Sequence, residues 1–269
     1  MQRNTKRKSI QEYLQIAAIV VLCVFTALFD IKDISFVEEF YNSMLCKILQ
    51  QACGSAAGIL IVLRLGIRLF DKPQNLLYLI PCLIVAVDNF QFSAYFNGKM
   101  QLVRTAPQDF ILFFAYCMLV GLFEEIIFRG IILSLLAGAF SKDKKGFLLT
   151  YVCSSLIFGL AHLFNGFSAG AFLQAGYTIL TGGLFAFCFI KTKNILCPAF
   201  VHGIFNFCGL LFDKVGLGNG VVFDTGTVIT MLIVSVVAGV FVLYKVWKYP
   251  DFEREELYNK LGIAMHKEG

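Results

Sequence analysis

Long apolar runs, separated by short polar connections, follow one another along almost the whole chain. Runs of about 20 apolar residues are long enough to cross a membrane as helices, and the alternating pattern of a membrane β-barrel is absent. We therefore predict an all-α fold, a polytopic membrane helical bundle. It has about eight transmembrane helices, at residues 13–29, 52–70, 77–96, 108–128, 147–165, 168–190, 195–212 and 226–246.

The fourth apolar run continues beyond its predicted end, from Ile131 to Phe140. A straight α-helix over residues 108–140 would be roughly 50 Å long. That length exceeds the hydrocarbon core of a bilayer, which is about 30 Å thick. We therefore expect a break or a bend near Arg129 and Gly130.

The composition agrees with a membrane protein, because hydrophobic residues make up 58% of the chain and charged residues only 15%. A soluble domain of this length needs more polar surface. No linker or internal repeat divides the chain, so we predict one integral membrane domain over 1–269 with a charged cytoplasmic tail at 248–269. The nine cysteines are scattered without a Cys-x-x-Cys pair, and we interpret most of them as small buried hydrophobic residues.

The positive charges are distributed unequally between the two sides of the predicted bundle. With both termini in the cytoplasm, 18 of the 23 Lys and Arg residues lie on that side and 5 on the other, as the positive-inside rule requires. The net charge of +5 is thus an orientation signal, with no nucleic-acid-binding patch. The N-terminal run lacks a cleavage site for a signal peptidase and is predicted to stay as the first span. We expect an integral protein of a bacterial cytoplasmic membrane.

A few ionisable and amide side chains interrupt the apolar runs. Ionisable groups at membrane depth are costly and therefore indicate a functional site. The third histidine, His266, lies in the polar tail and is expected to be solvated. The candidate site residues come from three separate runs: Glu124, Glu125, Arg129, His162, His202 and Asn206.

Helical spacing sorts these side chains into faces. Glu125 and Arg129 are four residues apart and can form an ion pair, and His202 and Asn206, also four residues apart, project together. Glu124 projects about 100° away from Glu125. We therefore expect Arg129 to neutralise one carboxylate while the other faces a cavity. The Glu125–Arg129 pair alone is equally explained as a structural contact.

Two hydrolytic mechanisms fit these residue types. In the first, which we favour, Glu124 activates a water molecule and needs no cofactor. His202 and Asn206 then stabilise the oxyanion, and His162 orients the water or protonates the leaving amine. In the second, Glu124, His162 and His202 bind a zinc ion. The chain has no His-Glu-x-x-His sequence, which the usual zinc protease helix carries.

The three motifs also occur together in a known family. Glu-Glu-x-x-x-Arg, Phe-x-x-x-His and His-x-x-x-Asn, in this order on successive apolar segments, resemble the CPBP family, named for CAAX proteases and bacteriocin-processing enzymes and also called Abi. The resemblance covers residues 108–212. It implies an intramembrane endopeptidase whose first glutamate, here Glu124, activates water. The family is described both as metalloproteases and as glutamic endopeptidases, so both mechanisms stay open.

The expected substrate is a membrane-associated peptide or protein, which is a CAAX-type, pheromone or bacteriocin-related chain by resemblance. Because no prenylation context is visible, we favour a peptide or small membrane protein that carries no prenyl group. The expected partners are membrane lipid and this substrate. Two other functions remain, a non-catalytic immunity or scaffold protein and a proton-coupled transporter that uses the buried carboxylate and histidines.

Two features do not fit the predicted spans well. Asp88, Asn89 and Gln91 lie within the third run. Three roles are open for them: a pair with Arg129, the lining of a substrate path, or the end of a span that is shorter than predicted. His202 follows Asn194 by only eight residues, which places it roughly 12 Å shallower than Glu124 in straight helices. Pro198 disfavours a helix just before it, so residues 195–197 are expected to be extended.

Overall fold

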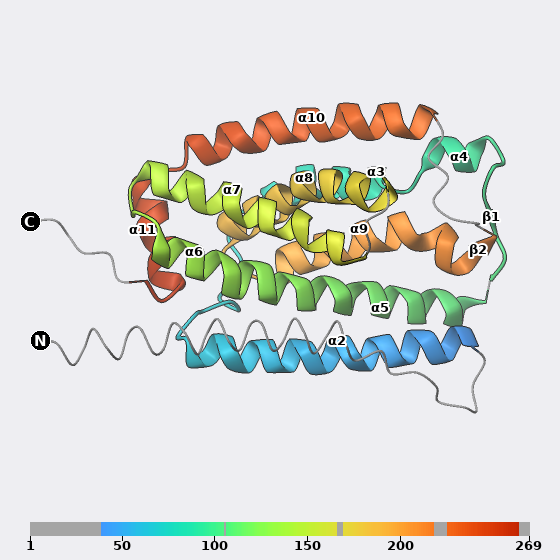
Figure 1. Ribbon diagram of the computed structural model, residues 1–269, viewed down its shortest axis with the longest axis horizontal. Coiled ribbons are helices and arrows are strands. Elements are labelled where there is room, and N and C mark those ends of the chain that lie inside the picture. Colours follow the sequence, from blue (N-terminus) through green and yellow to red (C-terminus); the bar gives the residue numbers. More distant parts are fainter. Residues whose placement is uncertain (1–38, 105, 166–168, 218–224, 264–269) are drawn as a thin grey trace, which may run out of the picture.

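Helices make up nearly all of the described chain, residues 39–104, 106–165, 169–217 and 225–263 of a computed structural model (Figure 1). Within these described residues, six helical segments are long and apolar enough to cross a membrane. They are α2 (Glu39–Arg64), the continuous segment Pro107–Ala139, α7 (Lys144–Ala161) with η3 (His162–Asn165), α8 (Ala169–Thr192), α9 (Leu196–Val215) and α10 (Thr225–Trp247). The predicted fold class, an all-α membrane helical bundle, is thereby confirmed.

The remaining elements are short and lie at the ends of the bundle or between its helices. They are η1 (Leu76–Tyr78), α3 (Leu79–Asp88), α4 (Phe92–Phe96), α11 (Asp251–Lys260) and two strands. The strands, β1 (Gln101–Leu102) and β2 (Gly216–Leu217), pair antiparallel with Gln101 opposite Leu217. This pair ties the start of α5 to the end of α9.

Two of the eight predicted spans differ from the structure, and a third lies outside the described residues. The span at 77–96 is wrong, because the helix ends at Asp88 and the chain turns through Asn89 and Gln91 before α4 begins. Gln91 has a left-handed backbone conformation, φ 56°, which ends the helix. The span at 52–70 begins earlier and ends earlier, as α2. The predicted span 13–29 and His266 fall on residues that the structure does not describe.

The long fourth segment changes its helical type where the sequence predicts a break. α5 (Pro107–Glu125) passes into the π-helix η2 (Ile126–Ile132) and then into α6 (Leu133–Ala139). The chain therefore stays helical through Arg129 and Gly130. π-Helical turns inside α-helices are frequent at functional sites.

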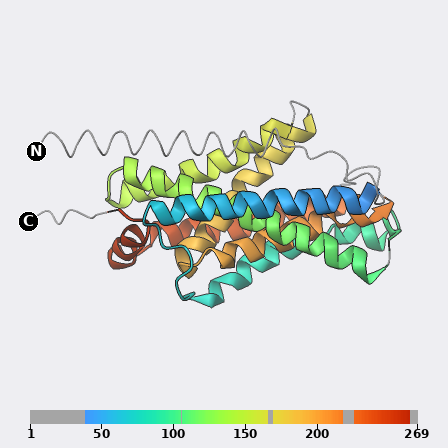
Figure 2. The same ribbon diagram turned by 90° about the horizontal axis from the view of Figure 1, so that it is seen from below.

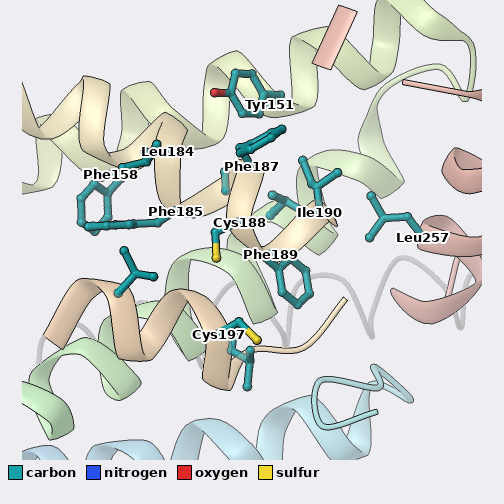
Figure 3. Packing of buried hydrophobic residues seen from close by; sticks show 14 of the residues in the cluster. Tyr151, Phe158, Leu184, Phe185, Phe187, Cys188, Phe189, Ile190, Cys197 and Leu257 are labelled. Atoms are coloured by element: carbon teal, nitrogen blue, oxygen red, sulfur yellow. The ribbon is translucent and has the colours of Figure 1, made fainter. Parts of the chain in front are cut away.

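α8 is the central helix of the bundle. Of its most apolar segment, 78% is buried inside the protein, compared with 11% for α10. Phenylalanines at every second position of its second half pack in different directions against surrounding helices, namely Phe185, Phe187 and Phe189 (Figure 3). α2 and α10 lie on opposite outer sides in Figure 1, and Figure 2 shows α2 running along the length of the bundle. Their exposed apolar faces suit contact with lipid.

The turn between α8 and α9 is buried below the end of the bundle rather than lying on its surface. Ile195 N donates to Leu69 O at 2.9 Å, and Asn194 Nδ2 donates to Asp71 O at 2.6 Å. Thr192 and Asn194 are 0% and 5% exposed. Because the α8–α9 turn is buried, the second turn of α9, which carries His202, lies deeper in the bundle than it would after a surface loop. The difference in depth expected between His202 and Glu124 is therefore absent.

Pro198 does not produce the extended segment expected before it. α9 begins at Leu196, and Ile195 already has helical angles, φ −70° and ψ −25°. Proline is tolerated in the first helical turn because the N–H groups there have no partner within the helix. The expectation of an extended 195–197 segment is therefore wrong.

The short helix α11 covers this buried turn. Lys193 Nζ, on the turn, pairs with Glu256, and Lys191 Nζ lies 3.2 Å from Glu253 Oε2. The hydrogen bond from Lys193 lowers the pKa of Glu256. α11 thus holds the turn from which the His202 helix starts.

We expect this contact to weaken in acid. A glutamate whose pKa is lowered by folding stabilises the fold above its ordinary pKa, about 4.3, and loses this contribution as the pH falls through the lowered value. Because Glu256 is half exposed, the contribution is at most about 1 kcal/mol. Hydrogen exchange of the α11 amides, corrected for intrinsic rates, should therefore quicken below about pH 4. Glu256→Gln should remove this pH dependence, whereas Glu255→Gln on the same helix should keep it; an unchanged profile in Glu256→Gln would contradict the assignment.

Candidate active site

The site forms where α5 and α9 approach each other most closely. A Cβ atom added to Gly121 would lie 2.7 Å from Ala199 O and 2.8 Å from Gly203 N, and one on Gly203 would meet Met118. Only glycine allows the two backbones to lie this close. Glu124 and Glu125 follow Gly121 by one turn, and His202 adjoins Gly203. The close approach therefore brings the carboxylates to the imidazole.

Glu125 bridges a guanidinium and an imidazole. Its Oε1 accepts hydrogen bonds from Arg129 Nη1 and from His202 Nδ1, both at 2.9 Å. Glu125 and Arg129 are 0% exposed. Because an ionised carboxylate only accepts hydrogen bonds, Nδ1 of His202 carries a proton.

Arg129 is held from several sides. Its Nη2 donates to Gly182 O on α8 at 2.7 Å. Its guanidinium carbon lies 4.4 Å from the ring centre of Phe158 and 5.6 Å from that of Phe185. Figure 3 shows these two rings beside each other, from α7 and α8. The arginine thus links α5 with both helices and compensates its burial with charge, hydrogen-bond and cation–π contacts.

The ring of His202 is fixed by aromatic contacts and faces the second carboxylate. It stacks on Phe185, with centroids 4.5 Å apart and planes at 20°, and meets Phe158 edge-on at 5.7 Å. Its Nε2 lies 3.7 Å from Glu124 Oε2, an atom that is buried and without a hydrogen-bond partner. The Glu124 side chain as a whole is 25% exposed. Glu124 thus differs from Glu125, whose Oε1 accepts hydrogen bonds from both Arg129 and His202.

A cavity of about 110 Å³ lies beside His202. His162 and Asn206 line it together with His202, Phe158 and Phe185. Nδ1 of His162 lies 2.9 Å from Phe158 O. Because a carbonyl only accepts, this nitrogen donates, and in the neutral imidazole Nε2 then carries the lone pair.

The six predicted site residues are thus brought to one region of the bundle, in two groups. Glu125, Arg129 and His202 are joined by direct hydrogen bonds, with Glu124 3.7 Å from the histidine. His162 and Asn206 share the cavity with His202, whereas neither glutamate lines it.

The residues of the zinc hypothesis do not converge as a metal site would require. In residues 39–104, 106–165, 169–217 and 225–263, no three His, Cys, Asp or Glu side chains lie close enough together to hold a metal ion. Glu124 and His202 are near each other, but among the described residues no third ligating side chain lies close enough to complete a set with them. The proposed ligand set of Glu124, His162 and His202 therefore does not fit a tetrahedral zinc ion.

Some side chains of the site were not predicted from the sequence. Phe185 supplies the stacking surface for His202, but nothing distinguishes it among the 29 phenylalanines of the chain. Gln91 lines the cavity, and its polarity within an apolar run was the available signal. Asp88, the neighbour that shares this signal, is not part of the cavity lining.

Comparison with family models matches residues 106–208 to type II CAAX prenyl endopeptidases, Rce1-like. Comparison with curated proteins and with solved structures finds no match. The matched segment runs from the start of α5 to the fourth turn of α9 and contains all six predicted site residues. The resemblance of the three motifs to the family that includes the CAAX proteases is confirmed. Residues 106–208 of this chain are therefore similar to the Rce1-like type II CAAX prenyl endopeptidases, a family of intramembrane proteases.

Proposed function

We propose that this protein is an intramembrane endopeptidase that hydrolyses a peptide bond with a water molecule activated by Glu124. The observation that carries the proposal is the different surroundings of the two carboxylates. Oε1 of Glu125 accepts hydrogen bonds from Arg129 and His202. Oε2 of both glutamates is buried without a hydrogen-bond partner, but only Glu124 is free of the Arg129 ion pair and partly exposed, at 25%. A carboxylate that is not neutralised by a guanidinium is free to accept a proton from water.

The position of the water follows from the distance between Glu124 and His202. Two atoms 3.7 Å apart can both contact one water oxygen at about 2.8 Å. Because Oε2 is buried and Glu124 does not line the cavity, we infer that substrate binding opens the space between Glu124 and His202 to this water. Glu124 would take its proton as the oxygen attacks the carbonyl carbon of the substrate, and would return that proton to the leaving amine.

The charge of His202 decides its role. Glu124, Glu125, Arg129 and an imidazolium at His202 together carry no net charge, which suits burial. In this state Nε2 of His202 donates a hydrogen bond, and the carboxylate of Glu125 stabilises the ring charge. We infer that, as the water attacks, Nε2–H shifts its hydrogen bond from the water to the substrate carbonyl oxygen, and that Nε2–H and the amide of Asn206, four residues further on the same helix, stabilise the oxyanion. His162, whose Nε2 carries a lone pair, would accept a hydrogen bond from the water and orient it.

We infer that the substrate is a peptide segment of a membrane-associated chain and that no prenyl group is required. The family is named for prenyl endopeptidases. In this chain the cavity at His202 mixes aromatic walls with amide and hydroxyl side chains, including Gln91, Gln174 and Thr178. Such groups recognise a peptide backbone through hydrogen bonds and contribute little to binding an isoprenoid.

A pair of peptides with the same sequence, one prenylated and one not, tests the substrate class. We expect the purified protein, in lipid nanodiscs, to cleave both at the same bond with rates that differ less than about tenfold. Product masses identify the bond. Cleavage of the prenylated peptide alone would contradict this substrate assignment and would leave the hydrolytic chemistry unaffected.

The orientation in the membrane is also an inference. α11 and the connection between α6 and α7 lie at one end of the bundle, and α4 with both strands lies at the other (Figure 1). Lys142, Lys144, Lys191 and Lys193 lie at or near the α11 end. The positive-inside rule then places α11 in the cytoplasm.

A further inference from the structure

Gln91 lies in the wall of the candidate active-site cavity with an unused hydrogen-bonding atom. The residue is 2% exposed, and its Oε1 is buried without a hydrogen-bond partner. It lines the same cavity as His162, His202 and Asn206. A buried amide oxygen without a donor is unfavourable, so such an atom in a native protein calls for an explanation.

The backbone at Gln91 is fixed in an uncommon conformation. Its φ of 56° and ψ of 44° are left-handed, a region that residues other than glycine rarely adopt. The neighbouring turn holds it there, because Asn89 Nδ2 donates to Phe205 O on α9 at 2.9 Å. A sequence under selection for stability alone would favour glycine at this position. The structure retains instead a long polar side chain that reaches the cavity.

Other polar groups of the cavity wall already have partners within the protein. The Thr178 hydroxyl donates to Gln174 O at 2.7 Å, and the Thr181 hydroxyl lies 3.4 Å from Thr178 O. Asn89 is used in the bond to α9. Among the cavity-lining side chains that the structure describes, Gln91 has the buried oxygen that lacks a donor.

An extended peptide brings the matching group. A substrate must be unwound around its scissile bond, and each main-chain N–H placed in a low-dielectric cavity needs an acceptor. We propose that Gln91 is a substrate-binding residue whose Oε1 accepts a hydrogen bond from a main-chain N–H of the substrate beside the scissile bond. This inference rests on the proposed endopeptidase function and names how that site recognises its substrate.

The substitution Gln91→Gly distinguishes a role of Gln91 in substrate binding from a role in holding the structure. Gln91→Gly suits the left-handed backbone and removes the amide, so we expect the variant to be at least as thermally stable as the wild type. Its kcat/KM for a peptide that the wild type cleaves should fall about tenfold, mainly through KM, as for one lost hydrogen bond. Gln91→Asn, which tolerates this conformation and keeps an amide, should lose less. Asn89→Leu is the matched control for structural damage and should lower thermal stability.

Ester substitution in the same peptide locates the hydrogen bond. Replacing one main-chain N–H by an ester oxygen, at positions next to the scissile bond but not in it, should lower kcat/KM of the wild type about tenfold at one position. At that position Gln91→Gly should lose nothing further, whereas Asn89→Leu should lose as much as the wild type. Equal ester effects in wild type and Gln91→Gly, or full activity of Gln91→Gly, would contradict this inference alone. Failure of the wild type to cleave any peptide of a broad library would contradict the proposed function as well.

Discussion

Glu124→Gln is expected to lower the rate of peptide cleavage about 10³-fold, because loss of a general base typically reduces rates by 10²–10⁴. The amide has nearly the shape of the carboxylate but cannot take a proton from water. Glu124 makes no hydrogen bond through its buried Oε2 and forms no close ion pair with Arg129. With glutamine at position 124 and a neutral His202 the buried group again carries no net charge, so the variant should fold and bind substrate nearly as the wild type does.

Two measurements separate this expectation from a structural explanation. The thermal midpoint of Glu124→Gln in detergent should stay close to that of the wild type, and its KM should change little. Glu39→Gln, at the exposed start of α2, serves as a matched carboxylate-to-amide control and should retain full activity. A Glu124→Gln enzyme that still turns over within tenfold of the wild type would exclude Glu124 as the base and would favour a binding or scaffold role for its surroundings.

Arg129→Met is expected to cause the largest loss of stability. Removing one partner of a buried ion pair leaves an uncompensated charge, and such changes cost roughly 3–5 kcal/mol. Here Glu125 would keep only His202 as a partner, and Gly182 O would lose its donor. The free energy of unfolding, measured by denaturant titration in mixed micelles, should fall by this amount, and activity should fall with it.

A second substitution tests the physical reason. In Arg129→Met combined with Glu125→Gln both charges are removed, so most of the lost stability should return while activity stays low. Arg129→Lys keeps the charge but not the paired donors and should fall between the wild type and Arg129→Met. Arg129→Met with wild-type stability would contradict the assignment of this pair as the buried link between α5 and α8.

Local spacing within one helix could be predicted from the sequence. The pairing of Glu125 with Arg129 follows from their separation of four residues, and the different direction of Glu124 from the helical angle. His202 and Asn206 likewise line one cavity because they share a helical face. These relations depend only on helix geometry. A long apolar run indicates a helix clearly, so the relations follow from it.

Relations between helices could not be predicted in the same way. The contact of His202 with Glu125 depends on the close approach at Gly121 and Gly203. The depth of His202 depends on the buried α8–α9 turn, which α11 holds through Lys193. The hydrophobic pattern of a single sequence carries no information about contacts between different helices. Asp88, Asn89 and Gln91 show the same limit, because hydropathy alone extended the third span across a turn that ends the helix.

The most direct test of a water activated by Glu124 is cleavage of a quenched fluorescent peptide library by the purified protein and by Glu124→Gln, each with and without a strong chelator. We predict that the wild type cleaves at the same rate with and without chelator and that Glu124→Gln is about 10³-fold slower in both conditions. Wild-type activity that disappears with chelator and returns with zinc would contradict this account and would make the histidines metal ligands.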